Sequence, residues 1–126
     1  MKVAIGFVVA ALLTTATAAL EEVSQVDLGY PSVAAAMTGL RAKPGVKSST
    51  QSGWVIFEDS AARAVWSFPP SDHAAYPTAI RRRIVQKGDD IVVEMDVRCE
   101  SAKTACDAVV AEFERLNGKV GQDLKR

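Results

Sequence analysis

Three groups of residues in this sequence have types and spacings that could perform chemistry. An Asp72-His73 pair lies in a segment bounded by prolines, three arginines follow at 81–83, and two cysteines stand at 99 and 106. A histidine beside a carboxylate suggests general-base catalysis, which also needs a nucleophile and a group that orients the ring. Because adjacent residues seldom orient each other in that way, we expect His73 and Tyr76 to anchor this loop or to line an anion site.

The arginine run suggests anion binding. In the strand register given below, Arg81 and Arg83 lie opposite carboxylates, which predicts exposed ion pairs that stabilise the fold little. Alternation instead points Arg82 toward the aliphatic face of the strand. A cation on that face extends to the sheet edge, lies in a bulge, pairs with a buried acid or binds an anion. Arg82 is therefore a candidate loop or anion-site residue, together with His73 and Tyr76.

The N-terminus has the features of a signal peptide. Met1-Lys2 is positively charged, residues 3–13 are apolar, and Ala16-Thr17-Ala18 matches the A-x-A pattern of signal peptidase. The apolar run is shorter than the roughly 20 residues that a spanning helix needs. We expect residues 1–19 to be removed, which leaves a periplasmic or secreted domain at 20–126 without a stable membrane anchor. Residues 20–29 are a polar leader, either flexible or folded over the sheet.

The two cysteines predict one disulfide. Cys99 and Cys106 are the only cysteines, and an even count in an exported protein favours a bond between them. Their C-x6-C spacing differs from the C-x-x-C of redox centres. With a single distant histidine, His73, the ligands for zinc are too few. We therefore expect a structural disulfide and neither a metal nor another cofactor.

Composition limits the classes of partner. The 126 residues include 15 basic and 15 acidic ones, so the formal charge is zero. Nucleic acids and anionic membranes favour strongly basic proteins, and we expect neither as a partner. The length and the hydrophobic share of 48% are those of one globular domain.

The hydrophobic pattern predicts an α+β domain: a helix, a four-stranded antiparallel meander and a C-terminal helix. The first helix begins at Tyr30-Pro31-Ser32 and ends at Lys43-Pro44-Gly45. The last begins at a Ser101 cap and ends at Asn117-Gly118. We expect both helices to cover one face of the sheet. The strands are expected at 54–58, 63–68, 78–86 and 91–99, with loops at 59–62 and 87–90 and with 46–51 lengthening the first strand.

The second hairpin supports its own register. A loop at 87–90 places Gln86 opposite Ile91, and opposite charges then face each other on one side while aliphatic residues face each other on the other. This agreement between loop length and residue pattern favours the pairing. The expected pairs are Arg81–Asp96, Arg83–Glu94, Ile84–Val93 and Ile80–Val97.

The first hairpin divides its apolar residues between two faces. With a loop at 59–62, the core under the helices would consist of Val55, Phe57, Trp66 and Phe68. A second apolar group would lie on the outer face, where it is either covered by the leader or exposed as an interface, because large exposed patches tend to mark interfaces. The candidate interface residues are Trp54, Ile56, Val65, Val85 and Val92.

Residues from Tyr30 to Asp107 resemble a family of small exported proteins of unknown function from proteobacteria. Some members carry a DnaJ-type chaperone label, but this sequence has no His-Pro-Asp tripeptide, because His73 is followed by two alanines. The resemblance implies export and adds no catalytic residue. The similar elements are Lys43-Pro44-Gly45-Val46, Gly53-Trp54-Val55-Ile56, Val65-Trp66-Ser67-Phe68, the His73 to Pro77 loop and the segment from Cys99 to Asp107.

These observations favour a non-catalytic exported module that binds a protein partner or a second copy of itself. An alternative within the same class is a periplasmic inhibitor or immunity protein that blocks an envelope enzyme. The alternative from another class is an envelope hydrolase or isomerase that uses His73, Asp72 and Arg82. That hypothesis requires these three side chains to surround one concave pocket.

Overall fold

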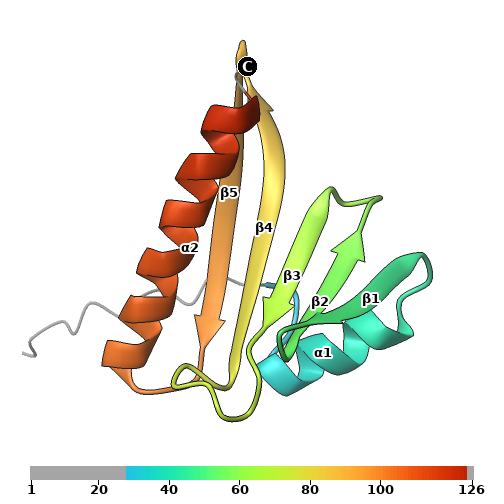
Figure 1. The fold of residues 1–126 in the computed structure, drawn as a ribbon. Helices are drawn as coiled ribbons and strands as arrows, with labels where there is room; N and C mark the ends of the chain where they lie inside the picture. The colour runs from blue at the N-terminus through green and yellow to red at the C-terminus, as the bar shows by residue number, and fades with distance from the viewer. Residues whose placement is uncertain (1–27, 125–126) are drawn as a thin grey trace, which may run out of the picture.

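The computed structural model describes residues 28–124, so the predicted signal peptide and leader residues 20–27 lie outside the described residues. The predicted α+β order of helix, antiparallel meander and C-terminal helix is confirmed, with five strands instead of four. The elements, shown in Figure 1, are α1 (Val33–Ala42), β1 (Val46–Gln51), β2 (Trp54–Asp59), β3 (Ala64–Phe68), β4 (Thr78–Lys87), β5 (Asp90–Cys99) and α2 (Lys103–Leu124).

The additional strand is β1, which was expected to lengthen its successor. Ser52 and Gly53 both have positive φ, 50° and 82°, so the chain reverses between β1 and β2. Glycine adopts this backbone conformation without steric cost, whereas it is uncommon for serine. The strands then pair in chain order, β1-β2-β3-β4-β5, and every pair is antiparallel.

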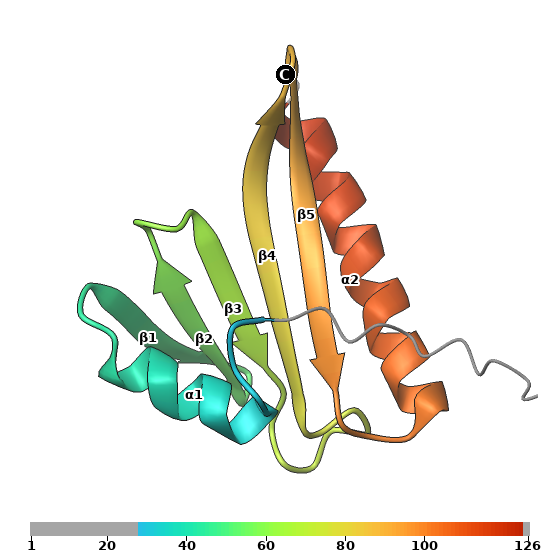
Figure 2. The same cartoon turned by 180° about the vertical axis from the view of Figure 1, so that it is seen from behind.

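The two helices pack on opposite faces of the sheet, which corrects the expectation that they share one face. The cluster containing Val33, Ala36 and Leu40 of α1 includes Phe57 and Trp66. The cluster containing α2 residues includes Ile80. Ile80 pairs with Ser67, the neighbour of Trp66 in β3, so its side chain points to the face opposite that of Trp66. Figures 1 and 2 show α1 and α2 on either side of the sheet. We call these surfaces the α1 face and the α2 face.

The predicted core of the first hairpin is confirmed on the α1 face. Phe57 is 0% exposed and lies against Phe68 with the rings edge to face and their centroids 5.6 Å apart. Trp66 adds a second large ring, which contacts Tyr30 at 5.8 Å. Leu28, at the end of the leader, is also buried in this cluster. Leu28 therefore packs on the α1 face.

The register of the β2–β3 hairpin differs by two residues from the predicted one. Phe57 pairs with Trp66, and Asp59 belongs to β2, so the loop is 60–63 and not 59–62. Asp59 Oδ1 accepts a hydrogen bond from the Ala62 backbone N–H, and Arg63 has a φ of 51°. A shift of two preserves strand parity, so each side chain keeps its predicted face within this hairpin.

Asp59 also connects this loop to the end of α1. Lys43, the residue that caps the C-terminus of α1, donates from Nζ to Asp59 Oδ2 at 2.6 Å. The Asp59 side chain is 6% exposed, whereas that of Lys43 is 48% exposed. The hydrogen bond from Lys43 is the main reason that the pKa of the Asp59 carboxyl is lowered from 3.8. This ion pair therefore stabilises the folded state most while the carboxyl is ionised.

We expect Asp59→Asn to destabilise the protein by about 1.5 kcal/mol at pH 7, because a charged hydrogen bond is lost. Since the folded-state pKa lies below the unfolded value of 3.8, the contribution is complete above that pH and is lost as the pH falls below it. Urea unfolding from pH 7 to pH 3 should show a smaller decline for Asp59→Asn than for the unmodified protein. Glu58→Gln, at a neighbouring exposed carboxyl without an ion pair in the described residues, is the control. Equal declines for Asp59→Asn and the unmodified protein would contradict this role.

The last helix differs from the prediction at both ends. The helix begins at Lys103, and the Ser101 hydroxyl donates to the Ala74 carbonyl at 2.8 Å instead of capping it. Asn117-Gly118 does not end the helix, which continues to Leu124. A glycine in a helix costs about 1 kcal/mol relative to alanine and does not by itself terminate one. The extension carries Val120 and Leu124 past the predicted end.

Candidate functional site

The five candidate interface residues do not form one surface. Val65 pairs with Arg82, and Trp54, Ile56 and Val65 lie on the α2 face. Val85 pairs with Val92, and strand parity places both on the α1 face. The face assigned to these two valines was therefore wrong, because it depends on the β3–β4 register. No local turn fixes that register, since residues 69–77 intervene.

Trp54 is packed beneath α2, so it is unsuitable as the centre of an exposed patch. Its ring centroid is 5.6 Å from that of Phe113 and 5.1 Å from that of His73. Phe113 in turn lies 5.0 Å from the guanidinium carbon of Arg82. These four side chains form a row on the α2 face, with His73 at one end and Arg82 at the other.

The three residues of the hydrolase hypothesis do not surround one pocket. Two aromatic rings, Trp54 and Phe113, separate His73 from Arg82. Asp72 is exposed and makes no hydrogen bond to the His73 ring in the described part of the chain. His73 Nδ1 accepts from the Ala75 backbone N–H at 3.0 Å, which anchors the loop. This arrangement removes the geometric basis for catalysis by these residues.

Tyr76 and His73 lie on different sides of their loop. Tyr76 is 49% exposed and borders a cavity lined by Met37 and Thr38 of α1. His73 instead contacts Trp54 on the α2 face. These two residues and Arg82 therefore do not form one anion site.

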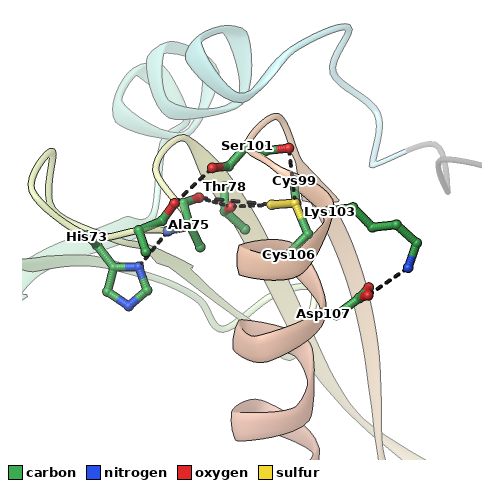
Figure 3. Close-up of a disulfide and its surroundings, with 9 residues drawn as sticks. His73, Ala75, Thr78, Cys99, Ser101, Lys103, Cys106 and Asp107 are labelled. Atoms are coloured by element: carbon green, nitrogen blue, oxygen red, sulfur yellow. Dashed lines mark hydrogen bonds and ion pairs between the residues drawn. A yellow bond between two sulfur atoms is a disulfide. The ribbon is translucent and has the colours of Figure 1, made fainter.

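The predicted disulfide is confirmed. Cys99 at the end of β5 is bonded to Cys106 in the first turns of α2, with the two Cα atoms 5.8 Å apart. Figure 3 shows the 71–77 loop against this bond: Thr78 Oγ1 hydrogen-bonds to the Ala75 carbonyl and lies 3.0 Å from Cys99 Sγ. The disulfide thus connects β5, α2 and the loop at one end of the molecule, and its presence is compatible with an oxidising location.

A cleft of about 450 Å³ lies farther along α2, between this helix and the sheet. We call it the α2–sheet cleft. Its size is within the range of about 300–1,000 Å³ that is usual for ligand pockets. The apolar lining residues are Ala64, Val65, Ile84, Val93 and Val120, and the polar ones are Glu58, Asp59, Ser60, Arg63, Arg82 and Asn117.

Arg82 is the one member of the arginine run without a carboxylate partner. Arg81 Nη2 lies 2.7 Å from Asp96 Oδ2, and Arg83 lies 3.4 Å from both Glu94 and Asp96, so the predicted ion pairs are confirmed. The Arg82 side chain makes no hydrogen bond or ion pair with residues 28–124, and its Nε is buried without a partner, as are those of Arg81 and Arg83. Burial lowers the pKa of its guanidinium, which still remains protonated.

Asn117 Oδ1 is also buried without a partner, and Asn117 lines the same cleft. Asn117 Nδ2 contacts Met95 Sδ at 3.5 Å, which leaves the carbonyl oxygen without a donor. Asn117 was expected at the end of the helix, and the sequence therefore did not predict it as part of a site. The spacing of Phe113, Asn117, Val120 and Leu124, at intervals of three and four, was the signal that could have identified it.

Exposed aliphatic residues lie on β4, β5 and α2, three of the elements that line the cleft. Ile84 and Val120 line the cleft. Ile91 is two residues from the lining residue Val93 in β5 and so lies on the same face of the sheet. Figure 1 shows the C-terminal turns of α2 beside the end of the β4–β5 hairpin that carries these isoleucines. We call this group the apolar end; its members are Ile84, Ile91, Leu116, Val120 and Leu124.

Within residues 28–124 there is no group of metal-ligating side chains that could hold an ion, and no helix there is long and apolar enough to cross a membrane. No family model matches the chain, and neither do any curated protein or solved structure. The functional assignment therefore depends on the geometry of this molecule.

Proposed function

We propose that this protein is an exported, non-catalytic binding module that contacts a partner protein, or a second copy of itself, through the apolar end. One observation carries the proposal: of the six large hydrophobic side chains exposed in the described residues, five belong to this group. Contiguous exposed apolar side chains tend to mark protein interfaces.

Two features support export as part of the proposal. The N-terminal residues have the charge, length and small-residue pattern of a cleavable signal peptide. The Cys99–Cys106 bond is of a kind that persists in oxidising compartments such as the periplasm.

The contact surface differs from the one expected from the sequence alone. Trp54 contributes to packing between β2 and α2, so its replacement would disturb the fold as well as any interface. Ile91 and Leu124 are 39% and 42% exposed and do not line the α2–sheet cleft. They therefore test the contact without altering the cleft.

We expect Ile91→Asp and Leu124→Asp each to weaken association about tenfold, because a charge would have to be buried at the interface. Photocrosslinkers placed at these two positions in cells should give discrete products, of dimer mass for self-association or of larger mass for another protein. An inhibitor or immunity protein would be crosslinked to an enzyme. Thr38→Asp, on an exposed position of α1, is the matched control.

Sedimentation of the purified protein measures self-association directly. Absence of crosslinked products at both positions, together with a monomer at all concentrations, would refute the proposal. Equal association of Thr38→Asp and Leu124→Asp would also contradict it, because the contact would then not depend on the apolar end.

A further inference from the structure

The α2–sheet cleft has a chemistry that a protein contact at the apolar end does not use. We propose that this cleft binds a single-chain amphiphile, with the alkyl chain against its aliphatic residues and the carboxylate paired with Arg82. The proposal goes beyond the binding function above: the cleft shares Ile84 and Val120 with the apolar end, but the proposal depends on Arg82, which that contact does not use. Its failure would leave the association at Ile91 and Leu124 unaffected.

The guanidinium of Arg82 is the cation that would receive the carboxylate. It lies over the Phe113 ring, 5.0 Å from the ring centroid, among residues of an apolar face. A cation in such surroundings normally has an acidic partner. Its neighbours Arg81 and Arg83 follow that rule through Asp96 and Glu94, whereas Arg82 finds no acid in the described part of the chain. A carboxylate from a ligand would complete the pair.

The charge of the cleft favours a monoanion. Apart from Arg82, its one cationic lining residue is Arg63, which is exposed at the loop between β2 and β3. Asp59, another lining residue, already pairs with Lys43. A phosphate monoester carries between about −1.5 and −2 charges at pH 7 and would need a second cation beside the half-buried Arg82. A carboxylate carries one charge and matches the planar fork of a single arginine.

The aliphatic residues of the sheet wall favour an alkyl chain over a peptide. Every peptide unit brings a donor and an acceptor that need partners when buried. The sheet wall of the cleft offers mainly Val65, Ile84 and Val93, which cannot provide them. An alkyl chain has no polar atoms and gains free energy from contact with these residues. The open acceptor of Asn117 is available to water or to a polar atom near the ligand headgroup.

Isothermal titration calorimetry of the purified, disulfide-bonded protein with decanoate tests this proposal, at decanoate concentrations below micelle formation. We expect decanoate to bind about 10–100 times more tightly than 1-decanol, since the alcohol lacks the charge that Arg82 would pair with. Decyltrimethylammonium should not bind detectably. Decyl phosphate should bind more weakly than decanoate, because the single charge of Arg82 does not balance that of the phosphate.

Arg82→Met retains an unbranched side chain and should reduce decanoate affinity about 10–100-fold while changing decanol affinity little. Arg82→Lys should recover part of the loss, because the charge returns without the planar fork. The matched control is Arg63→Gln, which removes an exposed cation of the same cleft and should change affinity less than about threefold. Circular dichroism would verify that each variant is folded.

Glu58 provides a variant with the opposite effect. It lies on the same face as Arg82, with Val65 between them in the strand pairing, and it makes no ion pair in the described residues. Removing this negative charge by Glu58→Gln should strengthen decanoate binding. Three results would each overturn the proposal. They are equal affinity for decanoate and decanol, an Arg82→Met variant that binds decanoate as tightly as the unmodified protein, and no decanoate binding at millimolar concentration.

Discussion

Phe57→Ala should be the most destabilising single substitution considered, with a loss of about 3–5 kcal/mol in the free energy of unfolding. Phe57 is 0% exposed and lies between the β1–β2–β3 part of the sheet and α1. Its ring contacts Phe68 and stands opposite Trp66 in the β2–β3 pairing. Removal of the ring therefore leaves a cavity bordered by large side chains that cannot close it fully.

Urea denaturation followed by tryptophan fluorescence and by circular dichroism would measure this loss. Phe57→Leu is the control, because it keeps a large apolar group and should cost clearly less than the alanine variant. Val46→Ala provides a second comparison at a half-buried position beside the same cluster. A loss of under 1 kcal/mol for Phe57→Ala would mean that this cluster is not the principal core.

Features that depend on residues close together in the sequence were predicted correctly, whereas features that depend on contacts between distant residues were not. The β4–β5 register was predicted correctly, because a short loop and cross-strand charges such as Arg81–Asp96 and Arg83–Glu94 are local signals. In the β2–β3 hairpin, Asp59 belongs to β2 and bonds to Lys43, which is distant in sequence; the loop lies one residue later than predicted and the register differs by two. A loop residue with a tertiary partner cannot be recognised from the loop alone.

The arrangement of the two hairpins was not predictable by the same reasoning. Whether Val85 shares a face with Val65 or with Trp66 depends on the β3–β4 pairing, and residues 69–77 leave that pairing undetermined. The same uncertainty concealed the placement of α1 and α2 on opposite faces. It also limited the interpretation of the site, because the α2–sheet cleft is formed by β2, β3, β4, β5 and α2 together.

For Arg82, the sequence pattern predicted the face of the sheet but not the partners of the side chain. Strand alternation correctly placed it on the aliphatic face, but sequence could not show whether an acid would reach it there. In the structure Arg82 lies over the Phe113 ring, and it has no carboxylate partner in the described residues. The distinction between a structural and a ligand-binding arginine therefore depended on contacts made by α2, whose last turns the sequence analysis had omitted.

The second large effect is expected from the disulfide. The double variant Cys99→Ala/Cys106→Ala should lose about 2.5 kcal/mol in the free energy of unfolding, because the bond closes a loop of about eight residues in the unfolded chain. The two cysteines are separated by 7 positions and join β5 to the first turns of α2. Without the bond, Val109 and Phe113 must hold α2 on the sheet by packing alone.

Denaturation with and without dithiothreitol separates the bond from the side chains. The unmodified protein should lose stability on reduction and approach the double variant, whereas the double variant should not respond to the reductant. Because Val109 and Phe113 retain their contacts, the reduced protein should keep its helical circular dichroism at low urea concentration. If reduction changes the unfolding free energy by less than about 0.5 kcal/mol, the disulfide does not determine how firmly α2 is held. A loss of all structure would instead show that the sheet and α1 cannot fold without the α2 attachment.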